Sequence, residues 1–526
     1  MPTTNLGSAA GMAGWIAVLL ATTGLAFAPG GTHPGTGVAP VQNPVPLPLR
    51  DHGPLTSSVG SGAAASEAPH PALLLGPPSP AGVNSVVTNL LMPGEPTPPA
   101  SDPVAGTFYV PLSNDEVAVI WGTADAVLAY VHVGDLPGTP VFDTVNGLVY
   151  VPNYESANVS AISTTTNSVV AWIPVGSFPT TPAFDSVDNR VYVPDGGGND
   201  VSVISGVAVT ATVPVGRAPL TPFYDAANGK VYVPNAQSNN ISVISVASNA
   251  VVATINVGSV PLTPVLDPAN GDLYVVNSDS GNVSVVSPAT NKVVATIAVG
   301  TGPSNPLFDA ENNLLYVPVQ TRGVVSVISC ASNSVVSSVP VGAVPLTPAM
   351  DTANGDLYVA NAASNNVSVI STASNEVVAT VPVGDTPWTA TFDPASAQVF
   401  VPDEGSLAVS VIAGGVTVTF QEAGLSAGSS WSVELGGTVA TATGASIEFT
   451  VLPGTYTYVV EPVSGYSVSP VSGDEVVGAT ASVVPVTFTS WWNANTGLVV
   501  ALVLGSAALG VSASTLVLLR RRRSSA

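Results

Sequence analysis

The sequence predicts an all-β fold whose main part is a ring of repeated four-stranded units. A phrase of about 42 residues returns along two thirds of the chain, marked each time by a tyrosine or, once, a phenylalanine. The markers are Tyr109, Tyr150, Tyr192, Tyr232, Tyr274, Tyr316, Tyr358 and Phe400. Within each copy, apolar and small polar residues alternate with period two, which is typical of β-strands. A period of 40 to 50 residues with several short strands per unit is typical of a β-propeller.

Composition supports the same fold class and excludes some functions. The chain of 526 residues is 46% hydrophobic and only 8% charged. Valine, serine, threonine and glycine are abundant, which favours strands over helices. The net charge of −23 repels nucleic acid and anionic lipid, so we exclude nucleic-acid binding. So sparse a charge, with few lysines, also suits an acidic environment, where carboxylates are partly protonated and repel one another less.

Each repeat is predicted to contain four strands. The copy from Asn249 to Val286 illustrates them. The strand Val-Val-Ala-Thr-Ile-x-Val-Gly comes first and belongs to one unit. The next unit begins with a short strand ending Pro-x-x-Asp. An Asp-x-x-Asn-Gly turn follows, because aspartate caps such turns and glycine accepts a positive φ. The strands Tyr-Val-Val-Asn and Asn-Val-Ser-Val-Val then complete the copy.

The strand pattern predicts eight blades, with seven as the alternative. The chain enters the repeats on a strand at Val86–Gly94, which aligns with Val251–Gly258, and leaves them at Ala408–Ile412. We therefore expect the first strand to complete the last blade and to close the ring without a covalent link. If that degenerate strand did not pair, seven complete blades would remain. Closure hides strand edges that would otherwise pair with other chains.

The motifs Tyr150-Val-Pro-Asn153, Tyr274-Val-Val-Asn277 and Tyr358-Val-Ala-Asn361 resemble the YVTN β-propeller repeats. Each is followed by a strand such as Asn-Val-Ser-Val-Ile and by Val-Gly-x-x-Pro. The resemblance covers residues 84–415 and implies a propeller of the kind found in archaeal surface-layer and other cell-surface proteins. It implies no activity. Members of that family often have seven blades, from which the count of eight departs.

A second domain is predicted over residues 416–490, where the repeat period stops. Strands are expected at Val416–Phe420, Ser430–Leu435, Ala445–Val451, Thr455–Val460 and Ser482–Phe488, which suits a small β-sandwich of six or seven strands. The motifs Phe420-x-x-x-Gly424-Leu, Ser430-Trp431 and Pro453-Gly-Thr-Tyr456 resemble Ig-like, PEGA-like domains of archaeal exported proteins. The resemblance implies a stalk that holds the propeller away from the membrane.

Both ends of the chain predict export and anchoring. Residues 1–28 resemble a secretory signal, cleaved after Ala28 of Ala26-Phe27-Ala28, or alternatively an uncleaved anchor. Residues 29–83 are rich in proline, glycine and serine and predict a disordered linker. Residues 497–519 contain no charge and are long enough for a transmembrane helix. The basic tail 520–526, with four arginines, would stay in the cytoplasm. We therefore expect a single-pass membrane protein with an extracellular ectodomain.

Residues for catalysis, cofactors or metals are scarce in the pattern, and we predict none. The aspartates that end the short strands could in principle form a calcium-binding ring, but their shared turn position favours turn capping. They are Asp102, Asp143, Asp185, Asp225, Asp267, Asp309, Asp351 and Asp393. His132 falls in an outer strand, His33, His52 and His70 lie in the linker, and Cys330 has no activating neighbour.

Four Asn-x-Ser sequons begin the same strand in different repeats. They are at Asn158, Asn240, Asn282 and Asn366, and export would make them glycan acceptors on one rim. The alternative is that asparagine suits the turn and serine the strand, which produces the sequon by accident.

The function predicted from sequence is a non-enzymatic, membrane-anchored cell-surface protein. Its propeller would serve recognition, adhesion or surface-layer assembly, with extracellular protein or glycan partners or further copies of itself. The alternatives are an extracytoplasmic propeller enzyme, either an oxidoreductase or a lyase, and a sensor acting through a partner.

Overall fold

The computed structural model describes residues 83–103 and 105–490. Apart from two short 3-10 helices, η1 (Gly122–Ala124) and η2 (Glu404–Ser406), every regular element in this part of the chain is a strand. The predicted signal, most of the linker and the segment 497–519 lie outside the described residues. The described part of the chain is therefore nearly all β, as predicted.

The repeat region forms eight four-stranded antiparallel sheets. Seven of them use consecutive strands. The first four are β2–β5 (Ala100–Asp102, Thr107–Leu112, Glu116–Trp121, Ala126–His132), β6–β9 (Val141–Asp143, Leu148–Asn153, Asn158–Ser163, Ser168–Pro174), β10–β13 (Ala183–Asp185, Arg190–Asp195, Asp200–Ser205, Ala208–Pro214) and β14–β17 (Phe223–Asp225, Lys230–Asn235, Asn240–Ser245, Ala250–Asn256). The next three are β18–β21 (Val265–Leu266, Leu273–Asn277, Asn282–Ser287, Lys292–Ala298), β22–β25 (Leu307–Asp309, Leu314–Val319, Val324–Ser329, Ser334–Pro340) and β26–β29 (Ala349–Asp351, Asp356–Asn361, Asn366–Ser371, Glu376–Pro382).

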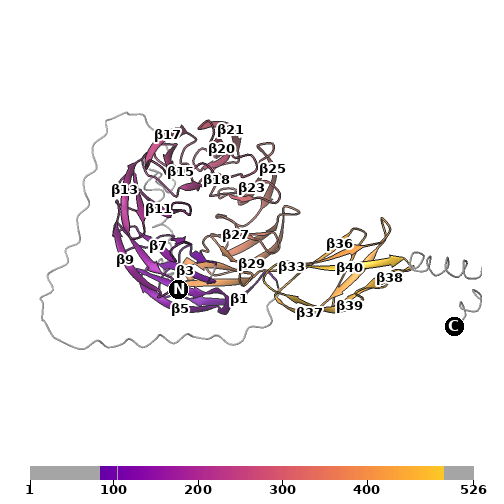
Figure 1. Ribbon diagram of the computed structural model, residues 1–526. Helices are drawn as coiled ribbons and strands as arrows, with labels where there is room; N and C mark the ends of the chain where they lie inside the picture. The colour runs from indigo at the N-terminus through magenta and orange to yellow at the C-terminus, as the bar shows by residue number, and fades with distance from the viewer. Residues whose placement is uncertain (1–82, 104, 491–526) are drawn as a thin grey trace, which may run out of the picture.

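The last sheet combines the two ends of the repeat region. It contains β30 (Thr391–Asp393), β31 (Gln398–Asp403), β32 (Ala408–Ala413) and, at its edge, β1 (Ser85–Leu91). Ser85 pairs with Ala413 and Leu91 with Ala408, so the expected pairing of the first strand is observed. Phe400 of this sheet also packs on Phe108 of the first sheet, with ring centroids 4.4 Å apart. The sheets therefore close into a ring (Figure 1).

Burial follows the position of each strand in its sheet. The second and third strands, such as β7 and β8, are buried almost throughout, because both faces of each sheet pack against neighbouring sheets. The fourth strands, such as β9, alternate exposed and inward-facing residues. Figure 1 shows these fourth strands at the circumference and the short β18 toward the centre. The repeated four-stranded sheets are those of a β-propeller-like fold.

Tyrosine hydroxyls of the second strands join six of the eight sheets to the next. Tyr109 donates to Asn167 Oδ1 at 3.0 Å, and Tyr274 donates to Asn333 Oδ1 at 2.7 Å. Each of these asparagines lies in the turn between the third and fourth strands of the following sheet and has a positive φ. The tyrosine marker of the repeat is therefore an inter-sheet contact as well as a core residue.

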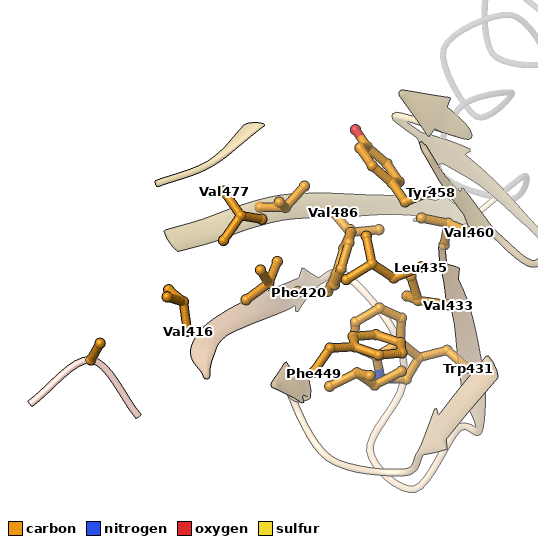
Figure 2. Close-up of a cluster of buried hydrophobic side chains, with 14 of the residues drawn as sticks. Val416, Phe420, Trp431, Val433, Leu435, Phe449, Tyr458, Val460, Val477 and Val486 are labelled. Carbon is orange, nitrogen blue, oxygen red and sulfur yellow. The ribbon is translucent and has the colours of Figure 1, made fainter. Parts of the chain in front are cut away.

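Residues 416–490 form two four-stranded sheets that share one core. One sheet has the order β36 (Ser446–Val451), β33 (Val416–Ala423), β40 (Ser482–Ser490), β38 (Tyr466–Ser469); the other has β35 (Thr438–Ala442), β34 (Trp431–Leu435), β37 (Gly454–Val460), β39 (Ser472–Val477). Figure 2 shows Phe420, Trp431 and Phe449 meeting in this core. The five expected strands are present, and β35, β38 and β39 are additional, because their short alternations are too weak to identify in sequence.

The sandwich packs against the turns between the first and second strands of the last two sheets. Ala353 and Ala397, from those turns, belong to the same buried cluster as Val416 and Val418. The connection is short, because β32 ends at Ala413 and β33 begins at Val416. In Figure 1 the sandwich extends away from the ring next to β29.

The prediction of a single-pass membrane protein is corrected by this structure. No helix within residues 83–103 and 105–490 is long and apolar enough to cross a bilayer. The segment on which the prediction depended, 497–519, lies outside the described residues.

Candidate functional site

One face of the ring, which we call the loop face, carries two kinds of loop in contact. In every sheet the residue that ends the second strand forms an isolated bridge with a proline in the loop entering that sheet, as Pro261 does with Asn277. The loop face is therefore built from the entering loops and the turns after the second strands. The sandwich contacts the opposite ends of the strands, so the loop face is not covered by it.

A buried polar row lies directly below the loop face. Its residues end the second strands: Asn153, Asp195, Asn235, Asn277, Asn361 and Asp403, replaced by Leu112 and Val319 in two sheets. Asn277 donates from Nδ2 to Asn282 Oδ1 at 2.8 Å and to Ser284 Oγ at 2.9 Å. A Cβ atom added at Gly258 would lie 2.7 Å from Asn277 Cβ, which explains the recurring Val-Gly. The row is part of the framework of each sheet.

The last sheet differs from the others at the residue that follows the polar row on the loop face. Glu404 follows Asp403 on the loop face and is 3% exposed. Its Oε2 accepts a hydrogen bond from Trp388 Nε1 at 3.0 Å, whereas its buried Oε1 has no hydrogen-bond partner among the described residues. The backbone fixes both residues: Glu404 N donates to Thr386 O at 3.1 Å, and Trp388 N donates to Pro402 O at 2.7 Å. No other sheet places an acid beside an indole at these two positions.

Electrostatics favour the protonated form of this carboxyl. Burial raises the pKa of Glu404, the hydrogen bond from Trp388 opposes that rise, and the Glu95 carboxylate adds to it. Below it, burial raises the pKa of Asp403 to about 6, against the lowering effect of a 2.5 Å hydrogen bond from Ser410. A raised pKa lets this carboxyl keep its proton to a higher pH than an exposed glutamate does, and a protonated carboxyl can donate its proton to a ligand.

The aspartates that end the short first strands cap turns, as predicted. All eight accept a backbone N–H two or three residues later; Asp267 Oδ1, for example, accepts from Ala269 N at 2.8 Å. They lie in separate turns, and no group of three or more potential ligands in the described chain could hold a metal ion. The turn position explains these residues without an ion.

The four sequon asparagines begin third strands and accept hydrogen bonds from the polar row. Asn158 Oδ1 accepts from Asn153 Nδ2 at 2.6 Å, and the hydroxyl of Ser160, which is fully buried, accepts from the same amide at 2.9 Å. Asn240, Asn282 and Asn366 repeat these contacts. Strand structure therefore explains why asparagine and serine recur here, and their use as glycan acceptors stays a prediction.

Neither His132 nor Cys330 lies in the Trp388–Glu404 site. His132 is exposed at the end of an outer strand, where it pairs with Glu116 across the sheet. Cys330 is buried, and burial raises the pKa of its thiol to about 11. A thiol that keeps its proton is a poor nucleophile.

Sequence reasoning did not identify Glu404 and Trp388. The feature that could have revealed them is a double departure within one repeat. Glutamate occupies a position that is Ala236, Ser278 or Ala362 elsewhere, and tryptophan occupies that of Leu220, Leu262 or Leu346. Only the bridge between Pro387 and Asp403 shows that these two positions meet.

The chain matches no protein-family profile and no curated protein. Among solved structures it is similar to Kuenenia stuttgartiensis hydrazine synthase, with 19% identity over 61% of this chain and 96% of that chain, at a TM-score of 0.44. It is also similar to the dihydro-heme d1 dehydrogenase NirN in complex with DHE, with 16% identity over 62% of this chain and 78% of that chain, at a TM-score of 0.50. Likeness at this identity shows the β-propeller-like fold alone.

The prediction that the chain is not an enzyme is corrected here. A solved structure of similar fold, NirN, is by its name a dehydrogenase, so this fold is compatible with catalysis. The prediction depended on the scarcity of histidine, cysteine and basic residues, which says little about chemistry performed by a carboxyl group. The buried Glu404 is a group of that kind.

Proposed function

We propose that the chain is an extracytoplasmic β-propeller enzyme in which Glu404 donates a proton to a ligand bound at the loop face. The proposal depends on the carboxyl group of Glu404: one oxygen accepts from Trp388, and the other is buried without a partner in the part of the chain that the structure describes. A buried carboxyl oxygen without a partner costs free energy unless it serves a ligand or carries a proton.

Among the two enzyme classes considered, this geometry favours a lyase over an oxidoreductase. Elimination breaks the bond to the leaving group and a neighbouring C–H bond and forms a double bond. Glu404 would protonate the leaving group, and the proton of the C–H bond would pass to solvent water. Trp388 would hold the carboxyl in one orientation, and its half-buried ring would offer an apolar surface beside it. The net charge of −23 disfavours anionic substrates, so we expect a neutral or cationic one.

The protonation state of Glu404 is the first test. Infrared difference spectra between the wild-type chain and Glu404→Gln should contain the band of a protonated carboxylic acid at pH 6. Glu422→Gln, in the sandwich, is the control and should leave that band unchanged. An ionised Glu404 at pH 6 would exclude the proposed role.

Activity is the second test. In a screen of neutral and cationic extracellular compounds, any elimination activity should fall by about 100-fold or more in Glu404→Gln. It should survive in Asp385→Asn, which changes an exposed carboxylate of the same entering loop. Equal turnover by Glu404→Gln and the wild type would refute the catalytic role.

Recognition or assembly at a cell surface is the second candidate, favoured by exposed apolar residues on neighbouring outer strands. Leu128 and Tyr130 of β5 are 50% and 38% exposed, and Val170 and Trp172 of β9 are 53% and 58% exposed. Exposed apolar patches often mark contacts with other proteins. Negative-stain images of the chain should then show regular oligomers that Trp172→Thr disperses, whereas Thr254→Ser, at the matching position of β17, leaves them intact.

The architecture proposed for either function is an eight-bladed, closed propeller with YVTN-like repeats, followed by an Ig-like sandwich that acts as a spacer. Eight four-stranded sheets and the pairing of β1 with β32 support the count. The two packed sheets of residues 416–490 support the spacer. The signal-like pattern of residues 1–28 supports export, and with it glycosylation at the sequons.

A further inference from the structure

A stacked aromatic pair lies elsewhere on the loop face, between the second and third sheets. Tyr154 follows β7, and Phe178 lies in the loop that enters the third sheet. Their ring centroids are 4.8 Å apart with an interplanar angle of 26°. Phe178 is 46% exposed. The matching entering loops carry no aromatic residue at this position; they carry Leu136, Ala218, Val260, Gly302, Val344 and Thr386.

The structure holds this exposed ring in place. Phe178 has a φ of +56°, which a bulky residue adopts only at a cost in free energy. The turn opposite it contains Gly196, Gly197 and Gly198, and a Cβ atom added at Gly197 would lie 2.6 Å from Phe178 Cδ2. Gly196 N also donates to Phe178 O at 3.0 Å. Gly197 therefore leaves room for the ring of Phe178.

Two exposed carboxylates border the pair. Glu155 follows Tyr154 directly, and its N–H donates to Asp135 O at 3.3 Å, which keeps these two residues side by side. Burial raises the pKa of Tyr154, and the charge of Glu155 raises it further, so this carboxylate acts on the phenol. Within the described chain, neither carboxylate has a Lys or Arg partner.

We propose that Tyr154 and Phe178, with Asp135 and Glu155, form a binding site for an organic cation of the alkylammonium class. The faces of aromatic rings attract cations, and ammonium groups with apolar substituents bind where such rings meet carboxylates. The site is separate from Trp388 and Glu404, which belong to the last sheet, and the proposal does not depend on their role.

Choline is the probe, and its neutral isostere 3,3-dimethylbutan-1-ol is the matched control. In saturation-transfer NMR with the full chain, choline should bind at least about fivefold more tightly than the alcohol. Its affinity should fall as the ionic strength rises. Phe178→Leu and Glu155→Gln should each weaken choline binding several-fold, whereas Val476→Thr, an exposed position of the sandwich, should leave it unchanged.

Two results would overturn the proposal. The first is equal binding of choline and the alcohol, which would indicate a merely apolar surface. The second is unchanged choline binding in Phe178→Leu, whose smaller side chain is still apolar and whose folding is checked by its melting temperature. Binding of a neutral sugar that Phe178→Leu abolishes, without choline binding, would likewise refute the cation site.

Discussion

The hydroxyl of Tyr358 donates a hydrogen bond to Asn84 Oδ1 at 2.5 Å, joining residues 274 positions apart. The corresponding bond from Tyr316 to Asn375 Oδ1, at 2.8 Å, spans 59 positions and joins sheets that are consecutive in the chain. Asn84 thus takes the place of the turn asparagines. It precedes β1, which is the fourth strand of the last sheet but the first described strand of the chain. The ring closes with the same contact that builds it.

Removing the closing bond should loosen β1 more than removing its internal counterpart does. Tyr358→Phe is expected to cost about 0.5–1.5 kcal/mol of stability and to speed amide hydrogen exchange in β1. Tyr316→Phe is the matched control. It removes the same kind of hydrogen bond, but its partner Asn375 is already connected to β28 and β29 by the chain. Equal exchange in β1 for the two variants would show that the closing bond has no special role.

Stability should decrease as the pH rises from 4 to 8. Burial raises the pKa of Asp195 from 3.8 to about 7 and that of Asp403 from 3.8 to about 6. A carboxyl whose folded pKa exceeds its unfolded pKa favours the folded state fully below the unfolded value. That contribution is lost as the pH rises through the folded pKa. Thermal unfolding at pH 4, 6 and 8 measures the effect.

Replacing these two carboxyls by amides should remove part of that pH dependence. Asp195→Asn and Asp403→Asn introduce the residue found at Asn153 and Asn277, and should stabilise the fold at pH 8 by about 1–4 kcal/mol. At pH 4 they should have little effect. The reverse change, Asn235→Asp, should destabilise the fold at pH 8. Identical pH profiles for the wild type and both Asn variants would contradict this account.

The recurring Val-Gly should tolerate no side chain. Gly258→Ala would place a methyl group 2.7 Å from Asn277 Cβ, so we expect a loss of about 1–3 kcal/mol. Gly478→Ala, in the sandwich, meets no atom within 4 Å and should be nearly neutral. Denaturant unfolding of the two variants provides the comparison. Similar denaturation midpoints for the two variants would indicate that the residues of the polar row shift to accommodate the methyl group.

Serine in the sequons should matter for the fold whether or not a glycan is attached. Ser242→Ala removes the acceptor of Asn235 Nδ2, and Ser202→Ala removes a hydroxyl that donates to Asp195 Oδ2 at 2.7 Å. Each should cost about 1–2 kcal/mol. Only Ser242 belongs to a sequon, so only its loss can remove a glycan from the exported protein. An unchanged mass on deglycosylation of the wild type would refute glycosylation.

The sequence by itself determined the repeated unit, because each strand buries alternate residues and each turn needs its own chemistry. Aspartate at the start of the Asp-x-x-Asn-Gly turns, asparagine at the end of the second strand and serine in the third are all local requirements. Because every repeat has these requirements, the same residues recur at the repeat period in the sequence. The pairing of Val86 with Ile412 was also predictable. The repeats begin with a fourth strand that has no sheet of its own and end with a sheet that lacks its fourth strand.

Tertiary structure alone decided which departures from the repeat meet. Glu404 and Trp388 lie 16 residues apart and become a pair because a bridge joins Pro387 to Asp403. Tyr154 and Phe178 come from different sheets, and Gly197 in a third segment leaves room for the ring of Phe178. Such contacts depend on how neighbouring sheets are placed, which no periodicity records. The framework is therefore predictable from local chemistry, whereas the sites proposed on it depend on contacts between loops.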